Sequence, residues 1–522
     1  MPDYSRFSLL NTLVKFAIDL PESYHLPLSL TRDLVNDTRV LKDNDIFCAV
    51  IGNQQDGRDY IDQAIKLGAA VVLTECTQAR LHGEVARGRV GTKTAVVIQF
   101  YQLNQHLFSL CQAYYQSPQK EMTVIGITGT NGKTSTCQLI ARLLENNQQS
   151  CAIIGTLGAG QLDHLTPLNN TTPGATELHY YFNQFRARKI ANVAMEVSSH
   201  ALAQGRIHAD ILDIAVFTNL SRDHLDYHQT MSAYAEAKQR IFTGNSKQIA
   251  VVNGDDKQAQ TWLAQWPDEQ QVIVFGRHLL TNVEQSPYPY YVAAKNIRLH
   301  NQGVEFSLTT HLGEQRVSSP LLGSFNIDNL LAAVAALLAK GLEFSAICQA
   351  IRYLTPVTGR MEAFSGEQQT TAVVDYAHTP DALANALDAC REHCQGQLWL
   401  VFGCGGDRDQ GKRPLMGKIA ENKADHIVIT NDNPRNEAPE LIVNDILAGC
   451  QCPEKIAIIL DRKQAVLATL AQAKADDIVL FAGKGHEDYI IIGSKKLHYD
   501  ERALVQVFFQ QQIKNNNNED SL

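Results

Sequence analysis

The sequence predicts a protein of three α/β domains built around parallel sheets. The chain has 522 residues, which at roughly 150 residues per domain corresponds to about three and a half domains. Short apolar runs typical of buried strands alternate with helix-compatible stretches, which is the pattern of parallel sheets covered by helices. The composition, 44% hydrophobic and 19% charged, excludes fibrous and largely disordered classes.

Charge, apolar runs and cysteine content indicate which partners and which cell compartment to expect. The chain has 46 basic and 55 acidic residues, a formal charge of −9 and no block of Lys and Arg, so nucleic acid and anionic membranes are disfavoured as main partners. The first residues lack the features of a signal peptide, and the longest apolar stretch, 330–339, is too short to span a bilayer. Eleven cysteines without a CxxC pair predict reduced thiols. We therefore expect a cytoplasmic monomer without membrane insertion.

The N-terminal domain is expected over residues 1–117. Apolar runs at 46–51 and 69–73 flank a helical pattern at 60–67. This βα rhythm indicates a small α/β domain.

The central domain is expected over residues 118–355. An apolar run at 122–127 leads into a glycine-containing loop and a helix-compatible stretch at 134–144. Further strand-like runs lie at 191–197, 214–218 and 249–253. This order predicts a doubly wound parallel sheet of the P-loop type, and residues 330–339 are predicted to form a buried helix.

The C-terminal domain is expected over residues 356–522. Helical stretches separate strand-like runs at 371–375, 398–402, 426–430 and 477–482. The pattern predicts an open, Rossmann-like parallel sheet.

The strongest local signal is the run TGTNGKT at 128–134, between an apolar strand and a helix. Glycines let backbone N–H groups face an anion, and the helix N-terminus adds a positive dipole. Lys133 can reach outer phosphates and Thr134 can offer a hydroxyl to Mg²⁺. The strict P-loop pattern needs Gly where Ile127 stands, so a plain glycine-rich turn is the alternative interpretation.

Two polar clusters follow other apolar runs, at 194–200 and 219–226. The carboxyl ends of parallel strands face the ligand crevice, so both clusters should converge on the nucleotide. Glu196 is a plausible Mg²⁺ ligand because hard cations prefer oxygen. Taken alone, a glutamate such as Glu196 at a strand end is more often a cap or a solvated residue, and His224 is more often a structural histidine than a ligand.

Taken together, the motifs resemble the Mur ligases of peptidoglycan synthesis. Besides TGTNGKT they are EVSSH at 196–200, NLSRDHLDYH at 219–228, YAEAK at 234–238, GSFNIDN at 323–329, GRME at 359–362, DYAHTP at 375–380 and GKGHE at 483–487. They occur in the family's order over nearly the whole chain. The tetrad DNPR at 432–435 resembles the branch that adds meso-diaminopimelate rather than lysine.

The resemblance implies an ATP site, with Mg²⁺ as cofactor. ATP would be bound by Gly129, Thr130, Asn131, Gly132, Lys133, Thr134, Ser135, Asn329, Arg360 and Asp375. Mg²⁺ would be held by Thr134, Glu196, His224 and a carbamylated Lys238, and the implied catalytic residues are Lys133, Lys238, His224 and Glu196. A carbamate on Lys238 makes chemical sense because it replaces a cation that repels Mg²⁺ by an oxygen pair. The alternative for Lys238 is an exposed helical lysine.

The resemblance also implies two further substrate sites. The UDP-muramoyl dipeptide would contact Thr38, Asn53, Gln54, Gln55, Asn170, Thr171, Thr172, Ser198, Gln204 and Arg206. Meso-diaminopimelate would contact Arg408, Asp432, Asn433, Pro434, Arg435, Gly483 and Glu487. A planar guanidinium suits the distal carboxylate that lysine lacks, and sites built around a polar group reject analogues without it by roughly 10⁴ or more.

The implied reaction is an ATP-dependent ligation. The γ-phosphate of ATP would pass to the free carboxylate of the D-Glu residue, and the amine of the amino acid would then attack the acyl phosphate. Two alternatives stay open. One is a folylpolyglutamate synthase-like ligase, which shares the TGTNGK loop, and the other is a nucleotide-binding switch without ligase activity.

Overall fold

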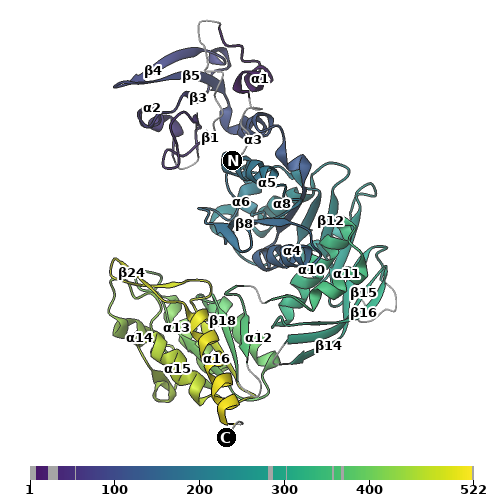
Figure 1. The fold of residues 1–522 in the computed structure, drawn as a ribbon, viewed down its shortest axis with the longest axis vertical. Coiled ribbons are helices and arrows are strands. Elements are labelled where there is room, and N and C mark those ends of the chain that lie inside the picture. The colour runs from purple at the N-terminus through teal and green to yellow at the C-terminus, as the bar shows by residue number, and fades with distance from the viewer. Residues whose placement is uncertain are drawn as a thin grey trace. The chain divides into compact units, whose positions relative to one another are not determined.

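The computed structural model describes residues 8–21, 33–52, 55–279, 286–300, 303–355, 358–365 and 370–519. By internal contacts the chain forms two compact units, one of residues 1–273 with 339–341 and the other of residues 274–338 with 342–522. Figure 1 labels many of the helices and strands of both units. Among the described helices, none is long and apolar enough to cross a membrane.

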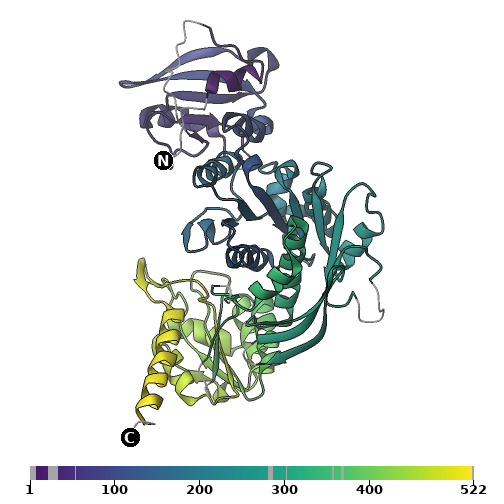
Figure 2. The same ribbon diagram turned by 45° about the vertical axis from the view of Figure 1, so that its right-hand side comes forward.

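The first unit begins with a five-stranded sheet in the order β1-β2-β3-β5-β4, parallel except for β4. Figure 2 shows this sheet in purple. Its elements are α1 (Leu9–Val14), β1 (Leu34–Val35), β2 (Ile46–Ala49), α2 (Ile61–Leu67), β3 (Val71–Cys76), β4 (Val85–Val90), β5 (Lys93–Tyr101) and α3 (Leu103–Tyr114). Val71 and Leu73 pack with residues of α1 and α3, whereas Val72 packs with residues of α2. Successive side chains of a strand point to opposite faces, so helices cover both faces of this sheet.

The same unit contains part of a second sheet, with strands in the order β12-β11-β6-β10-β7-β8-β9. The strands are β6 (Thr123–Thr128), β7 (Cys151–Gly155), β8 (Gly158–Gln161), β9 (His164–Thr166), β10 (Asn192–Glu196), β11 (Ile214–Phe217) and β12 (Ile249–Asn253). The helices are α4 (Lys133–Asn146), α5 (Ala175–Ala187), α6 (Ser199–Ala203), α7 (Leu225–His228), α8 (Met231–Gln239) and α9 (Lys257–Leu263). The strands from β12 to β7 are parallel, as predicted, and β8 and β9 add an antiparallel edge.

The register of this sheet positions the site. Glu196, the last residue of β10, pairs with Ile127 of β6, and Phe217, the last residue of β11, pairs with Thr128. The carboxyl ends of the neighbouring strands β10, β6 and β11 therefore lie at the same edge of the sheet, where the glycine loop begins.

The second unit contains an antiparallel ladder that the sequence analysis did not predict. It joins β14 (Tyr291–His300), β15 (Gly303–Thr310) and β16 (Gly313–Ser319), with β13 (Val272–Gly276) parallel to β14. The helices α10 (Ser324–Lys340) and α11 (Phe344–Ile351) follow. Residues 330–337 of α10 are buried, which confirms the predicted buried helix.

The second unit also contains a six-stranded sheet in the order β17-β18-β22-β19-β20-β21. Its strands are β17 (Glu362–Ser365), β18 (Thr371–Asp375), β19 (Leu398–Phe402), β20 (His426–Ile429), β21 (Ala457–Ile458) and β22 (Ile478–Ala482). Five are parallel, as predicted, and β17 pairs antiparallel with β18. A separate hairpin joins β23 (Tyr489–Ile492) to β24 (Lys495–His498).

Helices cover both faces of this sheet (Figure 1). They are α12 (Pro380–His393), α13 (Lys412–Lys423), α14 (Pro439–Leu447), α15 (Arg462–Gln472) and α16 (Glu501–Glu519). Leu400 and Leu480 pack with residues of α12, α13 and α14, whereas Val401 and Phe481 pack with residues of α15 and α16. The continuous apolar runs in these strands arise because both faces are buried.

Candidate active site

The glycine loop has the geometry of an anion cradle. Gly129 has φ +153° and Gly132 has φ +84°, and a Cβ atom at Gly129 would lie 1.9 Å from Oγ1 of Thr218. Gly132 precedes α4 without a side-chain cap, so the first N–H groups of the helix can bind an anion. Gly132 is therefore required for its conformation, and Gly129 for both its conformation and the space it leaves to Thr218.

Lys133 folds back over this loop. Its Nζ donates hydrogen bonds to the carbonyl oxygens of Gly129 and Thr130, each at 2.9 Å. Burial lowers the pKa of Lys133, and the negative charge of Glu196 opposes this shift. The ammonium therefore lies at the mouth of the cradle, where it can exchange carbonyl oxygens for phosphate oxygens.

The loop is tied to the segment that follows β11. The backbone N–H of Asn131 donates to Oδ1 of Asn219 at 2.9 Å, and Ser221 N donates to Oγ1 of Thr130 at 3.0 Å. The predicted convergence of the segments 128–134 and 219–226 is therefore observed. Ser135 lies in the first turn of α4.

Glu196 is the most buried acidic group beside the loop, with 2% of its surface exposed. Thr134 Oγ1 donates to both carboxylate oxygens at 3.0 Å, and Thr156 N donates to Oε1 at 2.8 Å. Burial raises the pKa of Glu196, and Lys133 opposes the shift. The alternative of a solvated Glu196 is therefore wrong.

These groups fit Mg²⁺ by their chemistry, since a carboxylate and a hydroxyl are the hard oxygen donors it prefers. In the part of the chain that the structure describes, no group of three or more His, Cys, Asp or Glu side chains is placed to hold a metal. A metal at Glu196 would therefore also need ligands of other types, such as the Thr134 hydroxyl.

Lys238 reaches the loop from α8. Only 1% of its surface is exposed, and Nζ donates to the Gly129 carbonyl oxygen at 2.6 Å. Nζ also lies 4.6 Å from the centroid of the Tyr234 ring. Burial lowers the pKa of Lys238 to about 6, and the positive charge of Lys133 adds to the shift. The alternative of an exposed helical lysine is therefore wrong.

His224 lies at the rim of the same site. Its side chain is 44% exposed and Nε2 is 3.4 Å from Oδ2 of Asp223. Its ring centroid is 4.9 Å from that of His200, and its backbone has φ +53°. The histidine is thus accessible beside the loop that follows β11.

Several predicted substrate residues gather near Glu196. Thr172 Oγ1 donates to the Glu196 carbonyl oxygen at 2.8 Å and accepts from Ser198 N at 2.9 Å. Arg206 Nη1 donates to the Thr172 carbonyl oxygen at 2.6 Å, and the hydroxyls of Thr171 and Thr156 are 3.2 Å apart. Two others lie nearer the surface: Asn170 is exposed, and Gln204 Nε2 donates to the Tyr227 hydroxyl at 3.3 Å.

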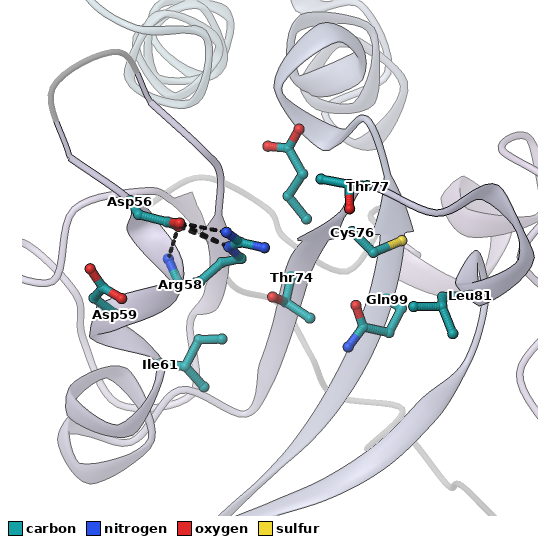
Figure 3. A pocket seen from close by; sticks show the side chains of 10 residues that line it. Asp56, Arg58, Asp59, Ile61, Thr74, Cys76, Thr77, Leu81 and Gln99 are labelled. Carbon is teal, nitrogen blue, oxygen red and sulfur yellow. Dashed lines mark hydrogen bonds and ion pairs between the residues drawn. The ribbon is translucent and has the colours of Figure 1, made fainter.

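The N-terminal sheet carries the other predicted residues of this substrate. Thr38 is buried and Gln55 is exposed, whereas Asn53 and Gln54 lie outside the described residues. Next to this segment is a pocket of about 440 Å³ (Figure 3). It is lined by Asp56, Arg58, Asp59, Ile61, Thr74, Glu75, Cys76, Thr77, Leu81 and Gln99, and Arg58 forms an ion pair with Asp56 at 2.6 Å.

Three predicted nucleotide residues belong to the second unit. Asn329 on α10 donates from Nδ2 to Oδ1 of Asn326 at 2.9 Å. Asp375, at the end of β18, accepts from the N–H groups of Met361 and Ala377, each at 2.8 Å, and burial raises its pKa. The guanidinium of Arg360 lies 5.2 Å from the centroid of the Tyr376 ring.

The tetrad 432–435 packs against the segment 483–489. Asn433 Nδ2 donates to Oε2 of Glu487 at 3.0 Å. Gly483 has φ +113°, and a Cβ atom there would lie 2.9 Å from Oδ2 of Asp432. The predicted residues of the C-terminal domain from 432 to 487 are thus brought together.

The two predicted arginines differ in how firmly they are held. Arg435 has φ +50° and donates from Nη1 to the Gly406 carbonyl oxygen at 2.8 Å. The backbone of Pro434 lies close to Gly406, because a Cβ atom at Gly406 would lie 2.0 Å from the carbonyl oxygen of Pro434. Arg408 is exposed and donates to the Asp407 carbonyl oxygen at 3.4 Å. The glycines at 405 and 406 therefore let the two loops approach.

Sequence reasoning missed three residues that contact predicted ones. Thr156 binds Glu196, and nothing local marks it, because its position follows from the pairing of β7 with β10. The Tyr376 hydroxyl donates to Oε1 of Glu487 at 3.4 Å. Lys484 contacts Asn433 and Glu487. Both residues lie within motifs that signalled them, DYAHTP and GKGHE.

Comparisons with known proteins identify the family of this chain. Residues 127–337 match the Mur ligase middle domain, and residues 359–485 match the family described as Mur ligase, glutamate ligase domain. A relative from Haemophilus influenzae (strain 86-028NP), named UDP-N-acetylmuramoyl-L-alanyl-D-glutamate--2,6-diaminopimelate ligase, is 42% identical over 478 residues, which cover 92% of this chain and 96% of the relative.

Solved structures extend the comparison. A structure of UDP-N-acetylmuramoyl-L-alanyl-D-glutamate--2,6-diaminopimelate ligase has a TM-score of 0.67 and 35% identity, covering 92% of this chain and 95% of the other. Folylpolyglutamate synthase from Mycobacterium tuberculosis, complexed with ADP and AMPPCP, has a TM-score of 0.54 and 17% identity, covering 73% and 92%. The second likeness concerns the fold alone. From its domain matches and its identity to this relative over nearly the whole length, the chain belongs to the Mur ligase family.

Proposed function

We propose that this protein is an ATP-dependent ligase that joins meso-diaminopimelate to UDP-N-acetylmuramoyl-L-alanyl-D-glutamate. The observation that carries the proposal is the tetrad 432–435 held against Glu487, in a chain 42% identical to a ligase named for this reaction. A diaminopimelate molecule offers an ammonium and a carboxylate at its distal end. The negative charge of Glu487 can pair with this ammonium, and the positive charge of Arg435 can pair with this carboxylate.

We assign one substrate to each predicted domain. Residues 1–117 would bind the UDP part of the sugar peptide, residues 118–355 ATP, and residues 356–522 the amino acid. Among the first set, Thr38, Gln55, Asn53 and Gln54 would contact the nucleotide. Asn170, Thr171, Thr172, Ser198, Gln204 and Arg206 would hold the muramoyl dipeptide. The site for its carboxylate is then beside Glu196, because Thr172 and Ser198 are hydrogen-bonded at the end of β10.

The first step is phosphoryl transfer. An oxygen of the D-Glu carboxylate attacks the γ-phosphorus of ATP, and the bond from this phosphorus to the β–γ bridging oxygen breaks. The products are ADP and an acyl phosphate on the D-Glu residue. Lys133 and the N–H groups of the loop hold the phosphates in line, and such positioning supplies most of the catalysis in phosphoryl transfer. Mg²⁺ held by Thr134, Glu196, His224 and the modified Lys238 would neutralise phosphate oxygens that otherwise repel the incoming carboxylate. Asn329, Arg360 and Asp375 would orient the adenine, phosphates and ribose.

The second step forms the amide bond. The neutral amine of diaminopimelate attacks the acyl carbon, the carbon–oxygen bond to phosphate breaks, and the proton lost by the amine leaves with the released phosphate. Arg408, Asp432, Asn433, Pro434, Arg435, Gly483 and Glu487 would fix the amino acid. Their task is orientation, since holding two reactants in attack geometry converts a bimolecular step into a unimolecular one.

We further propose that Lys238 is carbamylated to N6-carboxylysine. The support is its position: an almost fully buried amine lies at the carbonyl oxygen of Gly129 in the phosphate loop. A cation there beside Lys133 repels a metal, whereas a carbamate attracts one. We also propose that the enzyme is a cytoplasmic monomer. Its eleven cysteines are free, which supports the reducing compartment.

The test supplies ATP, Mg²⁺ and the UDP-muramoyl dipeptide with either meso-diaminopimelate or L-lysine. Phosphate release and the product mass are followed together. The proposal expects release and a product of the added mass with diaminopimelate, and at most a trace with lysine. A preference for lysine would overturn the choice of amino acid while retaining the ligase. Nucleotide binding without any product would favour the switch alternative.

A further inference from the structure

We propose that Lys484 is a positioning residue that makes the amino-acid site selective for diaminopimelate over lysine, an inference that rests on the proposed function. Lys484 is fully buried. Its Nζ donates to Oδ1 of Asn433 at 2.8 Å, to Oε2 of Glu487 at 3.2 Å and to the Tyr489 carbonyl oxygen at 2.9 Å. It also forms an ion pair with Oδ1 of Asp432 at 2.9 Å. One ammonium thus connects the tetrad to the segment 484–489.

The first consequence is a fixed orientation for Asn433. Its Oδ1 accepts from Lys484 Nζ and from Ile491 N at 2.9 Å, and both of these groups can only donate. A flipped amide would place its NH₂ group against two donors. Nδ2 is therefore directed at Oε2 of Glu487, 3.0 Å away.

The second consequence concerns the two oxygens of Glu487. Oε2 accepts from both Lys484 and Asn433. Oε1 accepts a longer hydrogen bond, 3.4 Å, from the Tyr376 hydroxyl, so it keeps the larger capacity to accept from a further donor. The ammonium of the amino acid is such a donor. Lys484 thereby determines which carboxylate oxygen of Glu487 is presented to it.

The third consequence is the charge of the site. Lys484, Arg435 and the exposed Arg408 carry positive charges, and Asp432 and Glu487 carry negative ones. Without Lys484 the site would be more negative by one charge. The distal end of diaminopimelate carries an ammonium and a carboxylate, whereas that of lysine carries only an ammonium. An excess negative charge repels the carboxylate and so favours lysine.

A second buried cation, Arg462 at the start of α15, shows the contrast. Arg462 is also fully buried, but it pairs with Glu501 and donates to the Ala482 carbonyl oxygen at 2.9 Å. Its carboxylate partner comes from α16 and is itself completely buried. Lys484 instead contacts Asn433 and Glu487. The proposed function places both residues in the amino-acid site, so the charge of Lys484 acts on the substrate.

The experiment compares Lys484→Met with the wild type, with Lys423→Met as matched control. Lys423 belongs to an ion pair with Asp388 on the neighbouring helices α12 and α13, and its replacement should leave all parameters unchanged. For Lys484→Met we expect the KM for diaminopimelate to rise about tenfold or more, as for loss of a charged hydrogen bond. The KM for ATP should change less than twofold. The ratio of kcat/KM for diaminopimelate to that for lysine should fall about tenfold.

A charge-restoring variant separates positioning from folding. Lys484→Met combined with Asp432→Asn removes the excess charge, and it should regain part of the discrimination against lysine that the single variant loses. If the single variant does not fold, this double variant is compared with Asp432→Asn alone, and a lower diaminopimelate preference in the double variant is expected.

Two results would overturn the inference. One is an unchanged KM for diaminopimelate with unchanged discrimination, and the other is an equal rise of the KM for diaminopimelate and ATP. If the wild type itself does not use diaminopimelate, the proposed function fails instead, so the two failures are distinguishable.

Discussion

Gly155 lies directly against the carboxylate of Glu196. A Cβ atom at Gly155 would be 2.3 Å from Oε1 and 2.8 Å from the carboxyl carbon. The two residues end neighbouring strands, β7 and β10. The absence of a side chain at the end of one strand therefore allows the buried acid of the other to reach Thr134.

Gly155→Ala should displace Glu196 without unfolding the sheet. The added methyl group forces the carboxylate away from Thr134, so we expect kcat to fall about tenfold to a hundredfold and the Mg²⁺ concentration for half-maximal activity to rise. Magnesium titration of activity measures both. The matched control is Gly174→Ala, because nothing lies within 4 Å of a Cβ atom at Gly174. Wild-type magnesium dependence in Gly155→Ala would contradict the assigned role of Glu196.

Lys238→Ala should lose activity by about a hundredfold or more, the scale of removing one electrostatic partner of the transferred group. A short carboxylic acid added to the assay should restore part of it, because it can occupy the space of the proposed carbamate. Activity with and without the acid measures this, and intact-protein mass at high bicarbonate should show one added CO₂ on the wild type alone. Full activity of Lys238→Ala would remove the carbamate proposal.

Arg435→Ala should weaken diaminopimelate binding far more than ATP binding. Loss of a guanidinium that pairs with a carboxylate should raise the KM for diaminopimelate about tenfold to a hundredfold. Steady-state kinetics with each substrate varied in turn provide the measurement. Arg391→Ala serves as control, because Arg391 forms an ion pair with Asp425 away from the tetrad. Equal effects on the two KM values would indicate a folding defect instead.

His179 should make the first unit sensitive to acid. The residue is fully buried, its Nδ1 contacts the Ala175 carbonyl oxygen at 2.8 Å, and its ring meets that of Phe108 on α3. Burial lowers its pKa to about 4, whereas a histidine in the unfolded chain has a pKa of about 6.5. Between these two pH values the unfolded state therefore binds one proton that the folded state does not. Stability is therefore complete above pH 6.5 and decreases as the pH falls, by about 2 kcal/mol at pH 5.

Denaturant unfolding at pH 7 and pH 5 measures this loss. In His179→Leu the difference between the two pH values should be smaller by about the same amount, since the proton-binding group is gone. An identical pH dependence in wild type and variant would show that other groups cause the acid sensitivity.

In the central and C-terminal parallel sheets the predicted runs agree with the observed strands to within about one residue, whereas the N-terminal run 69–73 differs from β3 (Val71–Cys76) by two to three residues. The runs 371–375 and 398–402 coincide with β18 and β19, because strands buried on both faces are continuously apolar. The ladder β14–β16 was not predicted. β16 is largely exposed, with buried residues at only two of its seven positions, so its sequence lacks the apolar run that marks a buried strand.

The sequence by itself determined the part of the site that is formed by residues close together in the chain. The run 128–134 contains its own glycines, its own helix start and its own lysine, so an anion cradle follows from neighbouring residues whatever surrounds them. Glu196 was predictable for a related reason: parallel strands end at one edge of a sheet, and a polar residue there faces the ligand.

Tertiary structure alone decided where the long cationic side chains lie. A lysine is compatible with solvent or with burial, and the choice depends on whether oxygen partners surround its ammonium. For Lys484 these partners come from residues 432–433 as well as from 487 and 489, and for Lys238 from a loop more than a hundred residues away in the chain. Only the folded sheets bring such distant segments within hydrogen-bond distance, so no local pattern contains this information.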